Sequence, residues 1–444
     1  MKETIALSLF AAGLIVCLCT GSPVLLALIF GYLLFAGYAL SRRFSIKEIL
    51  LMSWQGVRTV RNVLIVFIFI GMITAVWRGG GTIPLIVYAA SELIVPALFV
   101  PLTFGLNCLL SFLAGTAFGT AATMGVICMS IGQIMGIDTV MLGGVILSGC
   151  FFGDRCSPIS TSALLVSELT KTDIYRNIKN MVRTALVPFL LTCVFFICLG
   201  LFSHHQEGSL GILELLPRNF SLHWLTLLPA ILVLVLALFR LNVKWIMSAS
   251  IACAIVLCLT LQHMSLSELL TSLVMGYHSP DPRLAVFMDG GGIISMLNAA
   301  AIICLSSCYA GIFEKTGLLN RLKGWISTLS AKIGTFGSTM LTALATGAIA
   351  CNQVLSIMLV HQLCKDTIPD EYEMALTMEN TSVIMAPLIP WSIASGVPLA
   401  AIGAPDGSIL FAGYLYILPL WCFGVSLYKR RKQRKQLKPN AKNG

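Results

Sequence analysis

The sequence predicts an all-α polytopic membrane protein, with two inverted-topology repeats, discontinuous transmembrane helices and roughly 10–14 crossings of the bilayer. Three observations carry this prediction: the composition, a series of long apolar runs, and an internal sequence repeat. Hydrophobic residues make up 57% of the 444 residues and charged residues 11%, with a mean hydropathy of +0.90. A soluble surface needs about a quarter of its residues charged, so lipid is expected to solvate this chain.

The formal net charge of +10 is concentrated at one end of the chain. Eight of the 29 basic residues lie in 429–444 without an acid among them, and removing them leaves 21 basic against 19 acidic residues. The excess charge therefore predicts a basic tail and no nucleic-acid-binding surface. The 15 cysteines include no C-x-x-C pair, so neither a metal centre nor any other cofactor is expected.

Apolar runs of roughly 17–25 residues are long enough to cross a bilayer as helices. Four further stretches are equally long but are interrupted by Gly, Pro and polar residues, which indicates broken helices. The uninterrupted runs are 4–20, 24–40, 63–77, 182–202, 223–239, 245–261, 293–313 and 409–427, and the interrupted stretches are 102–135, 139–169, 335–363 and 378–402.

Basic loops predict the orientation, because Lys and Arg gather on the cytoplasmic side of membrane proteins. Basic residues are dense in 42–61, in 171–183 and in the tail, whereas 204–222 carries one Arg and two Glu. We therefore expect the three basic tracts and both termini in the cytoplasm, and 204–222 outside.

An internal repeat divides the chain. The segment S-I-K-E-I-L at 45–50, followed by Gly56, matches S-L-S-E-L-L at 265–270, followed by Gly276, at an offset of 220. The first copy is ringed by basic residues and the second is not, which predicts opposite sides of the membrane and hence an inverted repeat. The expected units are a first repeat at 1–203, an external linker at 204–222, a second repeat at 223–428 and a basic cytoplasmic tail at 429–444.

The first interrupted stretch places Thr116 and Thr120 on one helical face beside Gly115 and Gly119. Backbone that leaves helical geometry at membrane depth must line a cavity or be buried in protein. The threonine oxygens and freed carbonyls are therefore candidates for a cation or substrate site. The alternative is a close helix contact whose hydroxyls bond back to the preceding turn.

The second interrupted stretch holds Asp154, Arg155, Ser157 and Ser160 around Pro158. A charge at membrane depth costs several kcal/mol unless it is paired or hydrated, so these residues are functional candidates. Asp154 and the serines are candidates for cation, proton or substrate binding, with Arg155 as charge partner. The alternative is a purely structural ion pair or helix cap.

The third and fourth stretches add Asn352, Gln353, Glu379 and Asn380. The amides are suited to a cation or an amino-acid-like group, and Glu379 could exchange a proton for a cation. The alternatives are an interhelical hydrogen bond for the amides and a helix cap for the glutamate.

At these breaks the chain resembles the NhaC-type Na+/H+ antiporter family of the wider ion transporter superfamily. The resemblance lies in S-F-L-A-G-T-A-F-G-T-A-A-T-M (111–124), F-G-D-R-C-S-P-I-S (152–160) and M-E-N-T-S-V-I-M-A-P-L-I-P-W-S (378–392), with support from 311–317 and 346–357. It implies a bacterial inner-membrane secondary transporter that exchanges sodium for protons, and some relatives carry organic acids or amino acids.

Two departures from the family pattern affect the expected substrate. The family usually shows G-D-K-x-S-P-x-S-D-T-T, but Thr161, Ser162 and Ala163 stand where the second aspartate and the threonines would be. The usual L-E-D-S-G-T-V has become a segment with Asn380 in place of the aspartate. Two carboxylates are missing, which leaves room for an organic substrate.

The leading interpretation is a Na+/H+ antiporter that works by alternating access at a midplane site. The alternative is a carrier of an organic acid or amino acid coupled to Na+ or H+ on the same fold. No H-E-x-x-H motif or nucleotide-binding G-x-x-x-x-G-K-[ST] loop is present, so an enzyme and an ATP-driven pump are not expected. The expected partners are Na+ and H+ or a small organic solute, and the lipid bilayer, with a homodimer left open.

Overall fold

The computed structural model describes residues 2–20, 23–93, 96–202, 210–239, 241, 243–316, 330 and 332–437. Every regular element in these residues is helical, apart from an isolated bridge between Tyr277 and Gly290, which confirms the all-α prediction. The α-helices are α1 (Lys2–Thr20), α2 (Val24–Ser41), α3 (Ile46–Thr59), α4 (Arg61–Gly79), α5 (Thr82–Leu93), α6 (Pro96–Ala114), α7 (Ala117–Thr120), α8 (Val126–Ile134), α9 (Thr139–Cys156), α10 (Thr161–Thr170), α11 (Ile174–Phe202), α12 (Leu210–Asn219), α13 (Leu228–Leu238), α14 (Val243–Thr260), α15 (Leu266–Met275), α16 (Pro282–Met288), α17 (Gly292–Ser295), α18 (Leu297–Thr316), α20 (Thr335–Ala350), α21 (Gln353–Cys364), α22 (Glu371–Met378), α23 (Ile393–Ile402) and α24 (Gly413–Leu437).

Six short segments of other helical types complete the described chain. Two of them are π-helical turns that continue α7 and α22, and both lie within stretches predicted to be interrupted. These segments are η1 (Ala121–Gly125), η2 (Trp224–Leu227), η3 (Lys365–Thr367), η4 (Glu379–Val383), η5 (Ala386–Leu388) and η6 (Asp406–Phe411).

Each of the eight apolar runs lies mostly on helical elements, but 223–239, 293–313 and 409–427 each cover two elements. Within the described residues, five helical segments are long and apolar enough to cross a membrane, or six if one pair bent by 54° counts as a single span. Several shorter apolar helices accompany them. The total of 10–14 crossings stays a prediction. The candidate spans are Arg61–Gly79, Ala117–Ile134, Thr139–Thr170, Ile174–Phe202 and Val243–Thr260, with Glu371–Leu388 and Ile393–Ile402 as the bent pair.

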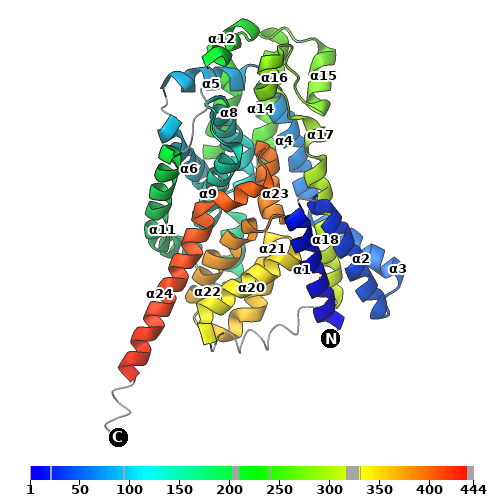
Figure 1. The fold of residues 1–444 in the computed structure, drawn as a ribbon, viewed down its shortest axis with the longest axis vertical. Coiled ribbons are helices and arrows are strands. Elements are labelled where there is room, and N and C mark those ends of the chain that lie inside the picture. Colours follow the sequence, from blue (N-terminus) through cyan, green and yellow to red (C-terminus); the bar gives the residue numbers. More distant parts are fainter. Residues whose placement is uncertain are drawn as a thin grey trace.

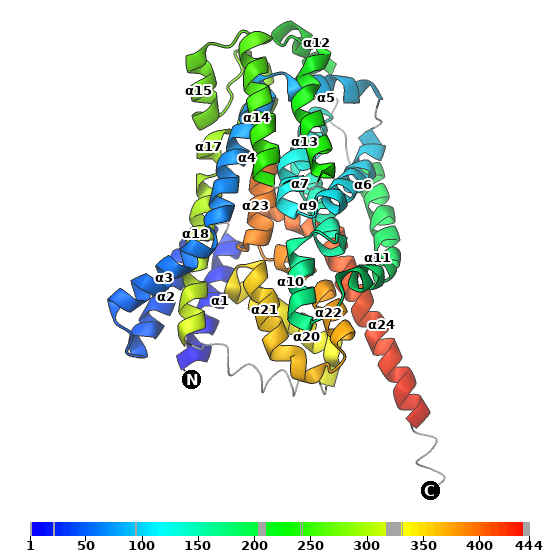
Figure 2. The same cartoon turned by 180° about the vertical axis from the view of Figure 1, so that it is seen from behind.

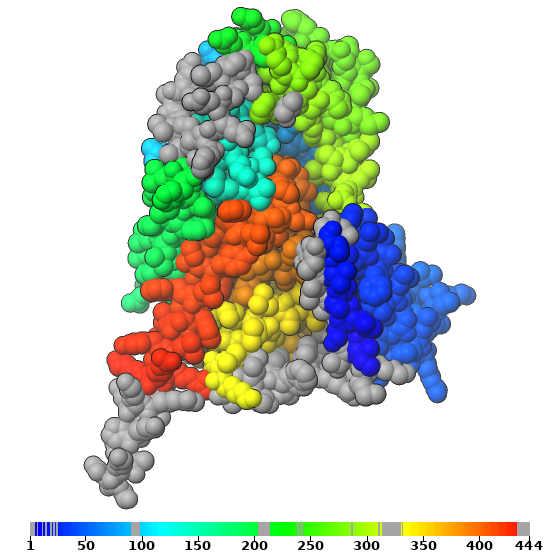
Figure 3. All heavy atoms as spheres, in the orientation of Figure 1, coloured from blue at the N-terminus to red at the C-terminus, as the bar shows by residue number. Residues whose placement is uncertain are grey.

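The helices form an elongated bundle (Figures 1 and 2). α5, α12 and α15 lie at its upper end, whereas α20, α22, the start of α1 and the end of α24 lie at the lower end. The space-filling view shows α24 running down one face beside α20 and projecting beyond the body (Figure 3). The basic end of α24 and the start of α1 therefore share one end of the molecule.

Helices from the two halves of the chain pack on one another. α3 lies against α18, and α15 lies against α4 and α17. The contact of α3 with α18 requires glycine, because a Cβ on Gly56 would stand 2.0 Å from the carbonyl oxygen of Ser307. Close by, the rings of Phe10, Phe35 and Tyr309 pack edge to face, with centroids 5.1–5.7 Å apart. The first and second halves are thus interleaved.

α3 and α15 begin with the same capping box. Ser45 accepts from the backbone N–H of Glu48, whose carboxylate accepts from the Ser45 backbone in return, and Ser265 and Glu268 repeat the arrangement. The hydrogen bond from the Ser45 backbone, then that from its hydroxyl, lowers the pKa of Glu48, and Ser265 lowers the pKa of Glu268 in the same way. The two helices lie toward opposite ends of the long axis (Figures 1 and 2).

Candidate functional site

Asp154 lies in the last turn of α9, and its carboxylate is buried among neutral donors. α9 ends at Cys156 because Pro158 follows two residues later and its ring disfavours helical geometry in the residue before it. Ser160 then caps α10, which brings its hydroxyl 3.1 Å from Asp154 Oδ1. Ser162 donates to Asp154 Oδ2 at 2.8 Å. Two residues of the first α10 turn thus hold the carboxylate.

Gln353 brings the second half of the chain to the same carboxylate. Its Nε2 donates to Asp154 Oδ2 at 3.2 Å and to the carbonyl of Val383 at 3.1 Å. Gln353 is the first residue of α21, directly after Asn352, which caps that helix by accepting from the backbone of Val354. Asn352 therefore has the structural role of a helix cap, whereas Gln353 belongs to the Asp154 cluster.

Arg155 is completely buried and turns away from Asp154, since consecutive helical residues face different directions. Its Nε and Nη2 donate to Asn380 Oδ1 at 3.1 and 2.5 Å, and Nη2 also donates to Thr184 Oγ1 at 3.0 Å. Its Nη1 donates to the Met181 carbonyl at 3.1 Å. Within the described part of the chain, no carboxylate oxygen lies within 4.0 Å of this guanidinium. Asp154 and Arg155 therefore form no ion pair with each other, which was the purely structural alternative for this segment, and the role of Arg155 as charge partner stays a prediction.

Glu379 opens the π-helical segment η4 and is 1% exposed. Its Oε2 has no hydrogen-bond partner among the described residues. Asp154 and Arg155 are both electrostatic neighbours of this carboxylate. Buried polar atoms are nearly always hydrogen-bonded, and an unpaired one is a position where a proton or cation would be stabilised.

Thr116 and Thr120 take the alternative role that the sequence analysis left open. Thr116 caps α7 by accepting from Gly119 N–H at 3.3 Å, and Thr120 donates back to the Thr116 carbonyl at 2.9 Å. Gly115, at φ +63°, packs against the next break, because a Cβ there would stand 2.4 Å from Ile159 Cγ1. The turn at Gly115 therefore packs against the turn between α9 and α10. The described hydrogen bonds of the Thr116 and Thr120 hydroxyls stay within their own segment and do not reach Asp154.

Ser157 has extended backbone and is buried, and its hydroxyl accepts from Ile159 N–H at 3.5 Å. It shapes the turn between α9 and α10. Ser162 and Thr184, in contrast, bind Asp154 and Arg155 directly but were not among the candidates. Ser162 could have been found as a polar residue in the first turn of α10, next to the cap. No sequence signal marks Thr184, because its role depends on how α11 packs.

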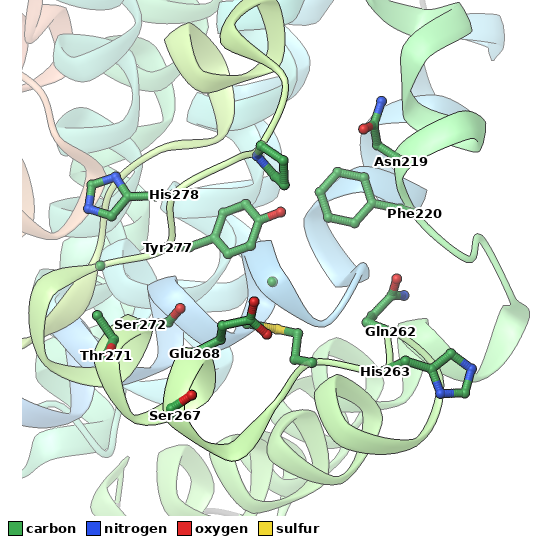
Figure 4. A pocket seen from close by; sticks show the side chains of 14 residues that line it. Asn219, Phe220, Gln262, His263, Ser267, Glu268, Thr271, Ser272, Tyr277 and His278 are labelled. Carbon is green, nitrogen blue, oxygen red and sulfur yellow. The ribbon is translucent and has the colours of Figure 1, made fainter.

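A polar cavity of about 490 Å³ lies at the upper end of the molecule, between the start of α15 and the loops beside it (Figure 4). Tyr277, Glu268 and Gln262 turn toward its centre. None of the candidate residues lines it. Within the described residues, no group of three His, Cys, Asp or Glu is arranged to hold a metal ion.

The apolar helices and the buried charged cluster define a helical membrane protein of the transport class. Its sequence matches the model of the Na+/H+ antiporter family over residues 1–168 and 149–407, and the chain belongs to that family. It is 24% identical to the malate-2H+/Na+-lactate antiporter of Bacillus subtilis, over 86% of this chain and 83% of the relative. The arginine/ornithine antiporter ArcD of Halobacterium salinarum is 29% identical (83% and 79%), and the Na+/H+ antiporter NhaC of Alkalihalophilus pseudofirmus is 24% identical (80% and 79%).

Proposed function

We propose that this antiporter exchanges Na+ for H+ by alternating access about the cluster of Asp154, Arg155 and Glu379. The observation that carries the proposal is that two buried carboxylates, Asp154 and Glu379, are electrostatic neighbours where segments from both halves of the chain join. Family membership and relatives named as Na+/H+ antiporters support the same exchange.

Asp154 is proposed as the cation-binding carboxylate. Ser160 and Ser162 already surround it, and a hydroxyl that donates to an empty carboxylate can turn a lone pair toward a bound cation. The amide of Gln353 has both a donor and an acceptor end, so a rotation would present its oxygen. Carboxylate and hydroxyl oxygens beside loosened helix ends are suited to Na+ in transporters.

Glu379 is proposed as the proton carrier. Its unpaired Oε2 is stabilised when the group holds a proton, and loss of that proton leaves a buried negative charge beside Asp154. The charged form of Glu379 then favours arrival of a cation, while the protonated form favours its departure. The two carboxylates can thereby couple the transport of Na+ in one direction to the transport of H+ in the other.

An inverted repeat would supply the two states that alternating access needs. Support comes from similar contacts in the two halves. Gly115 packs on Ile159, one residue after Pro158, and Gly347 packs on Ile389, two residues after Pro387. The capping-box helices agree with this symmetry, since α15 lies at the upper end of the bundle and α3 beside its lower half (Figure 1). We place the protein in a bacterial inner membrane with both termini in the cytoplasm, since the basic segments share one end.

The experiment is a sodium pulse applied to proteoliposomes that contain a pH dye. The intact protein should give a sodium-dependent pH change, and Asp154→Asn and Glu379→Gln should each abolish it without loss of membrane insertion. Glu214→Gln, on the exposed face of α12, is the matched control and should keep the wild-type response. Wild-type flux in both site variants would exclude these residues as the carriers.

A further inference from the structure

A cavity of about 790 Å³ lies at the lower end of the molecule, bounded by α11, α20, α22 and α24. Its outer lining carries Arg183, Lys429 and Arg430, against one acid, Glu373. Its volume lies within the range of about 300–1,000 Å³ that is typical of small-molecule sites.

The inner wall of this cavity is formed by the groups that hold Arg155. Thr184 and Asn380 both line the cavity, and both accept hydrogen bonds from the Arg155 guanidinium, at 3.0 and 2.5 Å. Arg155 therefore stands directly behind the wall. Glu379 is an electrostatic neighbour of Arg155, but the hydrogen-bond acceptors of the guanidinium are neutral, so its paired N–H donors lack the carboxylate that matches them best.

We infer that this cavity admits a small organic carboxylate whose anionic group binds Arg155 in place of Asn380 Oδ1. The mouth favours such a solute, since three basic side chains against one acid concentrate anions and repel cations. Trp421 and Val425 give the cavity an apolar wall that suits a short carbon chain. The inference builds on the proposed function: the carboxylate is a further solute of the same antiporter, bound beside its cation and proton sites.

The test uses the full-length protein in detergent and three probes: L-lactate, L-malate and lactamide, which is lactate without the charge. Thermal stabilisation and titration calorimetry give the binding. At least one carboxylate should raise the Tm, lactamide should not, and Arg155→Gln should weaken carboxylate binding at least about tenfold.

Arg183→Gln provides a second variant at an exposed position. It should weaken carboxylate binding about threefold and reduce its dependence on salt, whereas Arg218→Gln, at the opposite end of the molecule, should change neither. Equal responses to lactate and lactamide, no response to any carboxylate, or unchanged affinity in a folded Arg155→Gln protein would overturn the inference. If Arg155→Gln does not fold, unchanged affinity and salt dependence in Arg183→Gln overturn it.

A sodium pulse without carboxylate separates this inference from the proposed function. If the protein shows a sodium-driven pH change but binds no carboxylate, the proposed Na+/H+ exchange is supported and the carboxylate site is excluded. Charge-selective carboxylate binding that depends on Arg155, in a protein without any sodium-driven pH change, supports the carboxylate site and removes the Na+/H+ exchange.

Discussion

Gln353 donates a hydrogen bond to Asp154 across 3.2 Å, although 199 positions separate the two residues in the chain. The bond ties the start of α21 to the end of α9, and it places a neutral amide against a buried carboxylate. Together with the bond from Arg155 to Asn380, it joins the two halves of the molecule at the candidate site.

Gln353→Ala should destabilise the protein and weaken sodium-driven exchange. The change removes the Gln353 donor from the Val383 carbonyl and from Asp154 Oδ2, which keeps its bond from Ser162. Loss of a hydrogen bond to a charged group costs about 1.5–3 kcal/mol. The decrease in the free energy of unfolding is measured by chemical denaturation in detergent. Gln133→Ala on α8 is the control, because no side-chain hydrogen bond of Gln133 is recorded within the described residues. A decrease no larger than that of the control would show that the bond is not formed.

Gly115→Ala should be among the more damaging alanine substitutions in the chain. The backbone has φ +63°, and the new Cβ would stand 2.9 Å from the Ile159 carbonyl carbon, so α10 must shift. We expect a lower Tm and impaired exchange. Gly105→Ala is the matched control, since a Cβ there meets nothing within 4 Å and alanine favours a helix interior. Equal Tm values for the two variants would contradict this account of the break.

Asn380→Asp should close the inferred carboxylate site. The new carboxylate would stand where Asn380 Oδ1 now accepts from Arg155 at 2.5 and 3.1 Å, and it would pair with the guanidinium. Lactate or malate binding should fall at least about tenfold. Asn380→Ala removes the acceptor without adding a charge and should not weaken binding. Equal losses in the two variants would point to packing rather than to charge.

Acid should loosen the first turns of α3 and α15 before the core. The pKa values of Glu48 and Glu268 are lowered below their ordinary value of 4.5, so their capping contribution is complete above that pH. It is lost as the pH falls through the lowered pKa values. Hydrogen exchange, referenced to unstructured peptides, should show the loss, and Glu48→Gln should make α3 insensitive to this pH change. If the amide protons in these first turns stay equally protected from exchange down to the pH of global unfolding, the prediction is wrong.

Local sequence signals predicted the helices and the places where they stop. Pro158 and the capping serines are read directly from the chain, and the α9–α10 turn lies where they indicate. The partners of Asp154 and Arg155 could not be predicted in this way, because Gln353, Asn380 and Thr184 come from distant helices. Thr116 shows the converse: a threonine stripe beside a glycine fits both a binding site and a back-bonded cap, and tertiary packing decides between them.

Two of the contacts that join the halves at the candidate site also bear on how fast the protein can work. A hydrogen bond to a charged group contributes about 1.5–3 kcal/mol, so the bonds of Gln353 with Asp154 and of Arg155 with Asn380 together contribute about 3–6 kcal/mol. A turnover of about 10–1,000 per second corresponds to a barrier of about 13–16 kcal/mol. Breaking and remaking both bonds in every cycle therefore fits within the barrier of an ordinary transporter. The same bonds would hold one state long enough for a solute to bind.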